Sequence, residues 1–415
     1  MAAKGNLWRH PDFLRFWTAD TFTQFTGPIT ALALPTVAIL TLRVTALQLG
    51  ILTALGFVAF PALGLFVGVW MDRIRRKPVM IAVNVIEALT LGSVPVAFVL
   101  GVLSLYQLYA VALITGICTL FFAVAYQSYL PSLVDREDVI DGNQKLQTSA
   151  TAAQVAGPSV ASGLMQLVGA AVSVVADVVG TVVAALTLAT IRRPEPLPAP
   201  SSADGERHFF AEMKEGIAVI TRNSLLWTQA GCTGTSNLGS NIFFVAIFLF
   251  AYRTLGISQG VIGIAFTMGA VGGLIGVLAS AWVTRKLGLG PAIAVAMIGG
   301  FGFLIVLLAR GTFAVLIIGT ALFVESLGVP IYNINQVSLR QVITPNRLQG
   351  RMNATMRTIN WSTIPAGALL GGFFVTSLGI VPTLVVGALI SGGSVLWIAL
   401  GPTLRLRQQP APALD

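Results

Sequence analysis

Apolar segments of about 20 residues recur along the whole chain of 415 residues, separated by loops that hold most of the charges. One helix needs ~20 apolar residues to cross the hydrocarbon core of a bilayer, and it satisfies its own backbone hydrogen bonds there. The sequence therefore predicts an all-α membrane protein with about twelve transmembrane helices. We expect spans near 14–41, 47–71, 78–100, 104–127, 146–168, 171–191, 225–250, 259–283, 291–309, 312–335, 354–376 and 380–402.

Composition excludes a water-soluble globule, because 55% of the residues are hydrophobic and only 10% are charged, against about 25% charged residues in a soluble domain. The net charge of +9 does not indicate a nucleic-acid partner, because Lys and Arg are spread over the loops and form no basic stripe. Cys118 and Cys232 lie inside apolar segments without a CxxC motif or a neighbouring histidine. We therefore expect no disulfide framework, no metal site and no cofactor.

The positive charges fall mainly in alternate loops, and such loops face the cytoplasm. The opposite loops hold only Arg43, Arg253 and Arg310. This pattern predicts a multi-pass protein of the cell inner (cytoplasmic) membrane with both termini in the cytoplasm. The N-terminal segment lacks an apolar core followed by a cleavage site, so the first helix is expected to direct targeting. The bases of the predicted cytoplasmic loops are Arg73, Arg75, Arg76, Lys77, Arg136, Lys145, Arg192, Arg193, Arg207, Lys214, Arg222, Arg285, Lys286, Arg340, Arg347 and Arg351.

One long hydrophilic stretch, 192–224, lies near the middle of the chain and predicts a linker. It would separate an N-terminal six-helix bundle, 1–191, from a C-terminal six-helix bundle, 225–415. The later part of the linker repeats apolar residues at helical spacing, which predicts an amphipathic surface helix, although a plain tether is the alternative. Those apolar residues are Phe209, Met213, Ile217 and Ile220.

Two internal sequence repeats support a duplicated unit. GVWMDRIRRKP after the second span resembles SAWVTRKLGLGP after the eighth, and the segment leading into the fifth span resembles the one leading into the eleventh. The repeats align Trp70 with Trp282 and Gly157 with Gly367. Parallel repeats of this kind place a substrate cavity where two halves meet and rock about it.

The loop after the second span carries the strongest local motif, in which Gly68 is followed by Asp72, Arg73, Arg76 and Lys77. This pattern resembles the signature loop of the major facilitator superfamily. In that reading the glycine permits close helix packing, and the aspartate pairs with a cation or a helix N-terminus in one conformation only. We expect these residues to act as a conformational latch. The family has Gly where this chain has Arg75.

Two further segments resemble the branch of this superfamily that contains the enterobactin exporter and macrolide efflux proteins. One is LPSLVDREDVIDGNQKLQ leading to Gly157-Pro158, and the other is LRQVITPNRLQGRMNATMRTINW. The resemblance implies a major facilitator fold and export of small molecules. Gly157 and Pro158 resemble the antiporter motif of drug exporters, with Ala161 and Ser162 in place of its glycines. A proline kink that serves helix packing alone remains the alternative.

Ionisable residues inside predicted spans are costly, on the order of 3 kcal/mol each on insertion scales, and each suggests function. A carboxyl removed from water can alternate between protonated and ionised forms as a cavity opens to each side. On this hypothesis, the alternation couples proton flux to export. The candidates for coupling or substrate binding are Asp20, Gln24, Glu87, Glu325 and Arg357.

Asp20 ranks first, because the first helix of each half lines the cavity in the resembled family and Gln24 lies one turn along the same face. Glu87 can instead contact Asn84, Asp177 can be structural, and Arg357 can pair with an acid or extend to the cytoplasmic edge. Other polar or aromatic residues of the spans would line the cavity or join helices. They are Thr21, Tyr126, Gln229, Asn237, Asn241, Asn335, Asn360 and Trp361.

No Walker A, GxSxG or HExxH motif occurs, so we expect neither an enzyme with catalytic residues nor an ATP-driven pump. The expected function is secondary active export of small amphipathic molecules, of the drug, antibiotic or siderophore class, by proton antiport and alternating access. The expected partners are the cargo, protons and the bilayer, and the chain is expected to be a monomer. An importer or facilitator of a small metabolite on the same fold is the alternative.

Overall fold

The computed structural model describes residues 7–71, 74–135, 138–193, 195, 217–408 and 410, and these residues contain helices but no strand. The first half begins with a short 3₁₀ turn, η1 (Leu7–Arg9), and continues with long helices. These are α1 (Pro11–Leu40), α2 (Ala46–Met71), α3 (Arg76–Val99), α4 (Leu105–Leu133), α5 (Val139–Val168) and α6 (Ala170–Ala189).

Helices also form the second half. It contains α8 (Ser224–Leu249) with the π-helical turn η2 (Phe250–Thr254), α9 (Ile262–Leu287), α10 (Leu289–Ile298) with the 3₁₀ helix η3 (Gly299–Leu308), the turn η4 (Gly311–Phe313), α11 (Ala314–Ile343), α12 (Asn346–Leu378), α13 (Ile380–Gly393), α14 (Val395–Ala399) and the turn η5 (Pro402–Arg405).

Within the described residues, 11 helices are long and apolar enough to cross a membrane. α5 is not among them, because small and polar residues dominate its sequence from Asp141 to Gln154. It is nevertheless a helix of 30 residues that covers the fifth predicted span, 146–168. The prediction of an all-α membrane protein with about twelve spans is confirmed.

Two compact units make up the chain. Unit 1 comprises Met1–Val44, Leu55–Ser201 and Ser258–Gly263. Unit 2 comprises Thr45–Ala54, Ser202–Ile257 and Ile264–Asp415. The domain limits at 191 and 225 remain a prediction.

Most of the predicted surface helix of the linker, up to residue 216, lies outside the described residues. Residues 217–222 are helical, and Ile220 is buried in a cluster of unit 2 with Leu226, Met352 and Met356. The end of the linker is therefore held by packing within unit 2.

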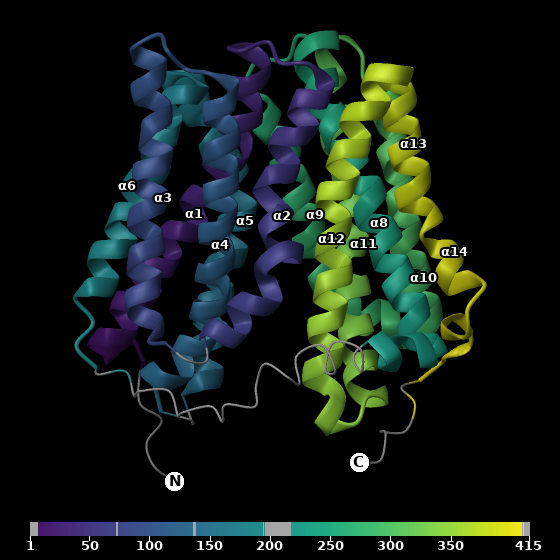
Figure 1. Ribbon diagram of the computed structural model, residues 1–415. Coiled ribbons are helices and arrows are strands. Elements are labelled where there is room, and N and C mark those ends of the chain that lie inside the picture. Colours follow the sequence, from purple (N-terminus) through teal and green to yellow (C-terminus); the bar gives the residue numbers. More distant parts are fainter. Residues whose placement is uncertain are drawn as a thin grey trace. The chain divides into compact units, whose positions relative to one another are not determined.

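Helices pair in the same order in both units. In unit 1, α1 packs on α5 and α6, while α3 packs on α4 and α6. In unit 2, α8 packs on α12 and α13, while η3 packs on α11 and α13. Each pair joins equivalent spans of its half, as a duplicated unit requires, and Figure 1 shows the long helices of each unit running side by side.

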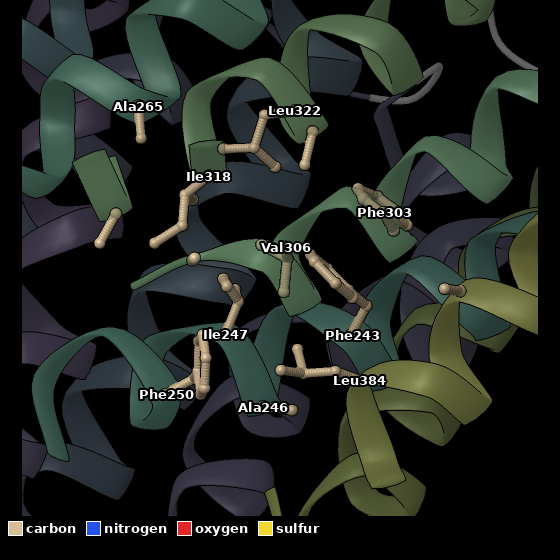
Figure 2. Packing of buried hydrophobic residues seen from close by; sticks show 14 residues of the cluster. Phe243, Ala246, Ile247, Phe250, Ala265, Phe303, Val306, Ile318, Leu322 and Leu384 are labelled. Carbon is tan, nitrogen blue, oxygen red and sulfur yellow. The ribbon is translucent and has the colours of Figure 1, made fainter. Parts of the chain in front are cut away.

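A stacked aromatic pair of unit 2 anchors η3 to its neighbours. Phe303 stacks on Phe243 of α8, with ring centroids 4.0 Å apart and an interplanar angle of 12°. Ile318 and Leu322 of α11 and Leu384 of α13 complete the same buried cluster, which Figure 2 shows from close by. The third span of unit 2 is thus held from three sides.

η3 is unusual because it keeps 3₁₀ geometry for 10 residues, whereas runs beyond 3–4 residues are uncommon. Glycines let it approach other backbones closely. A Cβ on Gly300 would lie 2.7 Å from the backbone nitrogen of Gly392, and one on Gly299 would lie 3.4 Å from the carbonyl oxygen of Glu325. η3 therefore packs directly against the backbone at Glu325.

Candidate substrate and coupling site

Asp20 lies in the middle of α1, which His10 caps by accepting a hydrogen bond from the Phe13 backbone N–H at 3.1 Å. The residue is only 2% exposed. The side-chain amide of Gln24 donates to its Oδ1 at 3.4 Å, and the Tyr126 hydroxyl of α4 is also hydrogen-bonded to its carboxyl group. The Oδ2 atom is buried without a partner among the described residues.

Tyr126, which contacts this carboxyl group, belongs to an aromatic cluster. The Tyr126 ring stacks on Phe16, with centroids 5.2 Å apart, and on Phe122, with centroids 6.0 Å apart. Tyr129 lies 5.5 Å from Phe16. Asp20 thus adjoins an aromatic cluster through Tyr126, and none of the ion pairs among the described residues involves it. Such a group can hold a proton, or a cationic ligand in exchange for one.

A pair of acids lies elsewhere in unit 1. Glu87 of α3 interacts electrostatically with Asp177 of α6. The Thr30 hydroxyl of α1 donates to Asp177 Oδ2, which ties α6 to α1. Asn84 donates to the backbone oxygen of Met80 at 2.7 Å, so its amide group bonds within its own helix.

The two predicted candidates of unit 2 differ in their surroundings. Glu325 of α11 is partly buried and accepts a hydrogen bond from the hydroxyl of Ser326 at 3.1 Å. Arg357 of α12 is exposed, and no ion pair among the described residues includes it. The structure therefore does not bring Arg357 together with an acid.

Several predicted lining residues of unit 2 join helices. The Asn237 amide of α8 donates to the backbone oxygen of Asn360 in α12 at 3.2 Å. Asn335 of α11 accepts from the hydroxyl of Thr284 in α9 at 3.0 Å. Asn241, in contrast, donates to the backbone oxygen of Asn237 at 2.8 Å, within α8 itself. These contacts give the three asparagines a structural role.

The structure describes only some residues of the predicted latch. Asp72 and Arg73 lie outside the described residues, and Gly68 has open space where a Cβ would stand. The Lys77 ammonium donates to the backbone oxygens of Ala189, at 3.2 Å, and Ile191, at 2.6 Å. Lysine is favourable at this place, because the carbonyl end of a helix is partly negative.

Sequence reasoning missed Glu195, which caps α3. Its carboxylate accepts from the backbone N–H groups of Arg76, at 2.8 Å, and Lys77, at 3.0 Å, and lies 3.5 Å from the Arg76 guanidinium. Asp12 similarly accepts from the backbone N–H groups of Arg192 and Arg193, at 3.1 and 2.9 Å. Two acids therefore fix the segment after α6 to the ends of α1 and α3.

Gly157 allows α5 to approach α1. A Cβ at this position would lie 2.7 Å from Cγ of Pro28, a rigid ring in the middle of α1. Pro158 lies inside α5. Gly157 thus permits the close packing of α5 on the helix that carries Asp20, and the choice between an antiport motif and a packing role remains a prediction.

A duplicated bundle of membrane-spanning helices with buried acids defines the chain as a polytopic membrane transporter. Residues 17–364 match the Major Facilitator Superfamily, and the chain belongs to this family. It is therefore a transporter and not an enzyme.

Relatives and solved structures agree with this assignment. Macrolide efflux protein A of Streptococcus pyogenes is 27% identical over 385 residues, which are 91% of this chain and 92% of that protein. A second protein of that name, from Enterococcus faecalis, is 31% identical over 178 residues, or 42% of this chain and 54% of that protein. The nucleoside transporter NupG (TM-score 0.71, 13% identity) and a bacterial homologue of the iron transporter ferroportin (TM-score 0.71, 16% identity) each cover 94% of this chain and 98% of their own. These structures share the fold.

Proposed function

We propose that the protein exports small amphipathic molecules of the drug or antibiotic class from the cell by proton antiport. The observation that supports export most is the similarity to macrolide efflux proteins, which extends over 91% of the chain. We place the protein in the cytoplasmic membrane with both termini in the cytoplasm, on the distribution of Lys and Arg over the loops.

Asp20 is the proposed coupling group. An unpaired charge removed from water is costly, whereas a neutral carboxyl group bonded to Gln24 and Tyr126 is well accommodated. A cationic or strongly polar cargo that reaches the carboxylate replaces the proton, and release of the cargo on the other side allows the proton to return. The stacked rings of Phe16, Phe122 and Tyr126 offer apolar area for the rest of the cargo.

Everted vesicles that contain the protein test this proposal. We expect a macrolide to cause proton release from energised vesicles, and we expect the Asp20→Asn variant to lose both this signal and cargo accumulation. The variant keeps the volume and one hydrogen-bonding oxygen of the side chain but cannot exchange a proton. Asp135→Asn, which removes an exposed acid from the end of α4, is the matched control.

The outcomes separate the alternatives. Cargo movement without a proton signal points to a facilitator or another ion. Accumulation by right-side-out vesicles but not by everted ones points to an importer. Full antiport by Asp20→Asn refutes the role of this carboxyl group, and Glu87→Gln and Glu325→Gln are then the next variants to measure.

A further inference from the structure

Positive charge is distributed very unevenly along the chain. Glu325 is the only acidic residue between positions 217 and 410, whereas the same segment contains many bases. Those bases are Arg222, Arg253, Arg285, Lys286, Arg310, Arg340, Arg347, Arg351, Arg357, Arg405 and Arg407. Any base buried in this part of unit 2 therefore has very few acids available as partners.

Arg340, near the end of α11, is such a base. It is 9% exposed, its Nε atom is buried without a hydrogen-bond partner, and no ion pair among the described residues includes it. Glu325 lies 15 residues earlier on the same helix, about 22 Å away along its axis at 1.5 Å per residue. Arginine is almost never buried in this way without a partner.

A second unsatisfied group lies close by. The Gln229 side chain of α8 is 1% exposed, and both its Nε2 and its Oε1 atoms lack partners. The Tyr332 hydroxyl of α11 donates to the backbone oxygen of Gln229 at 3.2 Å, and Tyr332 also interacts electrostatically with Arg340. Gln336 lies one helical turn from both Tyr332 and Arg340, on the same face of α11, and is 4% exposed.

We propose that Arg340 and Gln229, which both interact with Tyr332, bind an oxygen anion, either a carboxylate or a phosphate group. A guanidinium presents its donors in a planar fork that matches such groups, and the Gln229 amide supplies a further donor. The anion would provide the counter-charge that the sequence of this half lacks. Buried donors are nearly always satisfied in native proteins, so an acceptor from outside the chain accounts for both the Arg340 Nε and the Gln229 Nε2 donors at once. The site does not depend on the cargo or the direction of transport.

Thermal unfolding of the purified full chain tests the proposal. One arm adds inorganic phosphate or citrate in detergent, at an ionic strength held constant with chloride. The other arm compares nanodiscs of phosphatidylcholine with nanodiscs that also contain phosphatidylglycerol. We expect a saturable rise in Tm in at least one arm; a rise with the soluble anions identifies a free anion, and a rise with phosphatidylglycerol alone identifies a lipid headgroup.

Three variants assign the effect to the site. Arg340→Gln should lose the rise, or shift its midpoint to an about tenfold higher anion concentration. Arg285→Gln, which removes an exposed base from the end of α9, should retain the rise. Gln229→Met should raise the Tm without anion, because it removes an unsatisfied buried amide, and it should weaken the anion response. Should Arg340→Gln fail to fold, the result for Gln229→Met serves as the test of the proposal. No saturable rise in the wild type, or an unchanged rise in Arg340→Gln, overturns the proposal.

Discussion

The cap that Glu195 places on α3 predicts a large loss of stability when its carboxylate is removed. Glu195→Ala leaves the backbone N–H groups of Arg76 and Lys77 without their acceptor and removes an ion pair whose acid is only 3% exposed. Hydrogen bonds to a charged acceptor contribute about 1.5–3 kcal/mol each, and loss of an N-terminal cap costs about 0.5–2 kcal/mol. The two ranges partly count the same hydrogen bonds and cannot simply be added. We therefore expect Glu195→Ala to lower the free energy of unfolding by about 3 kcal/mol.

Glu195→Gln should cost less, about 1 kcal/mol, because its amide retains one acceptor oxygen. The assay is reversible unfolding of the purified protein in mixed micelles, followed by tryptophan fluorescence. Asp135→Asn is the control, since the Asp135 side chain is 79% exposed in its pair with Arg193 and such a pair contributes about 0–1 kcal/mol. If Glu195→Ala is no more destabilising than Asp135→Asn, the carboxylate does not hold the start of α3.

Two other predictions concern the surroundings of α1. Gly157→Ala should destabilise the protein by about 1–3 kcal/mol, because its methyl group meets the Pro28 ring. The control Gly163→Ala, at a helical site with open space, should be neutral or stabilising by up to about 1 kcal/mol in the same unfolding assay. Thr30→Val should cost about 1.5–3 kcal/mol, because it removes the hydroxyl that donates to the Asp177 carboxyl group. A wild-type unfolding curve for Thr30→Val would show that this hydrogen bond does not stabilise the packing of α6 on α1.

The spans could be predicted because the bilayer sets their length, whereas the true helix ends could not. α4 continues to Leu133, beyond the predicted end at 127, and α11 continues to Ile343, beyond 335. α5 begins at Val139 and α12 at Asn346, each before the predicted span. All four extensions consist of more polar residues, so hydropathy marks the part in hydrocarbon and not the whole helix.

The site could be predicted only where its residues share one helix. Gln24 was placed beside Asp20 from their spacing of four residues, and the structure confirms this contact. Tyr126 reaches the same carboxyl group from α4, and that contact depends on how two helices pack. Glu195 gave no signal, because it lies in a Pro-rich segment read as a linker. The first N–H groups of a helix need acceptors, and α3 has no capping side chain of its own. A search for an acid elsewhere in the chain that could accept from them could have identified Glu195.

The 3₁₀ helix η3 lengthens one span of unit 2. Ten residues of 3₁₀ helix rise about 20 Å at ~2.0 Å per residue, whereas the same residues in α-helical form rise about 15 Å. The 20-residue span Leu289–Leu308 is therefore about 35 Å long, against about 30 Å for 20 residues of α-helix. The third span of unit 2 therefore covers a greater thickness of hydrocarbon than its number of residues would suggest, and a comparison of span lengths by residue count alone underestimates it.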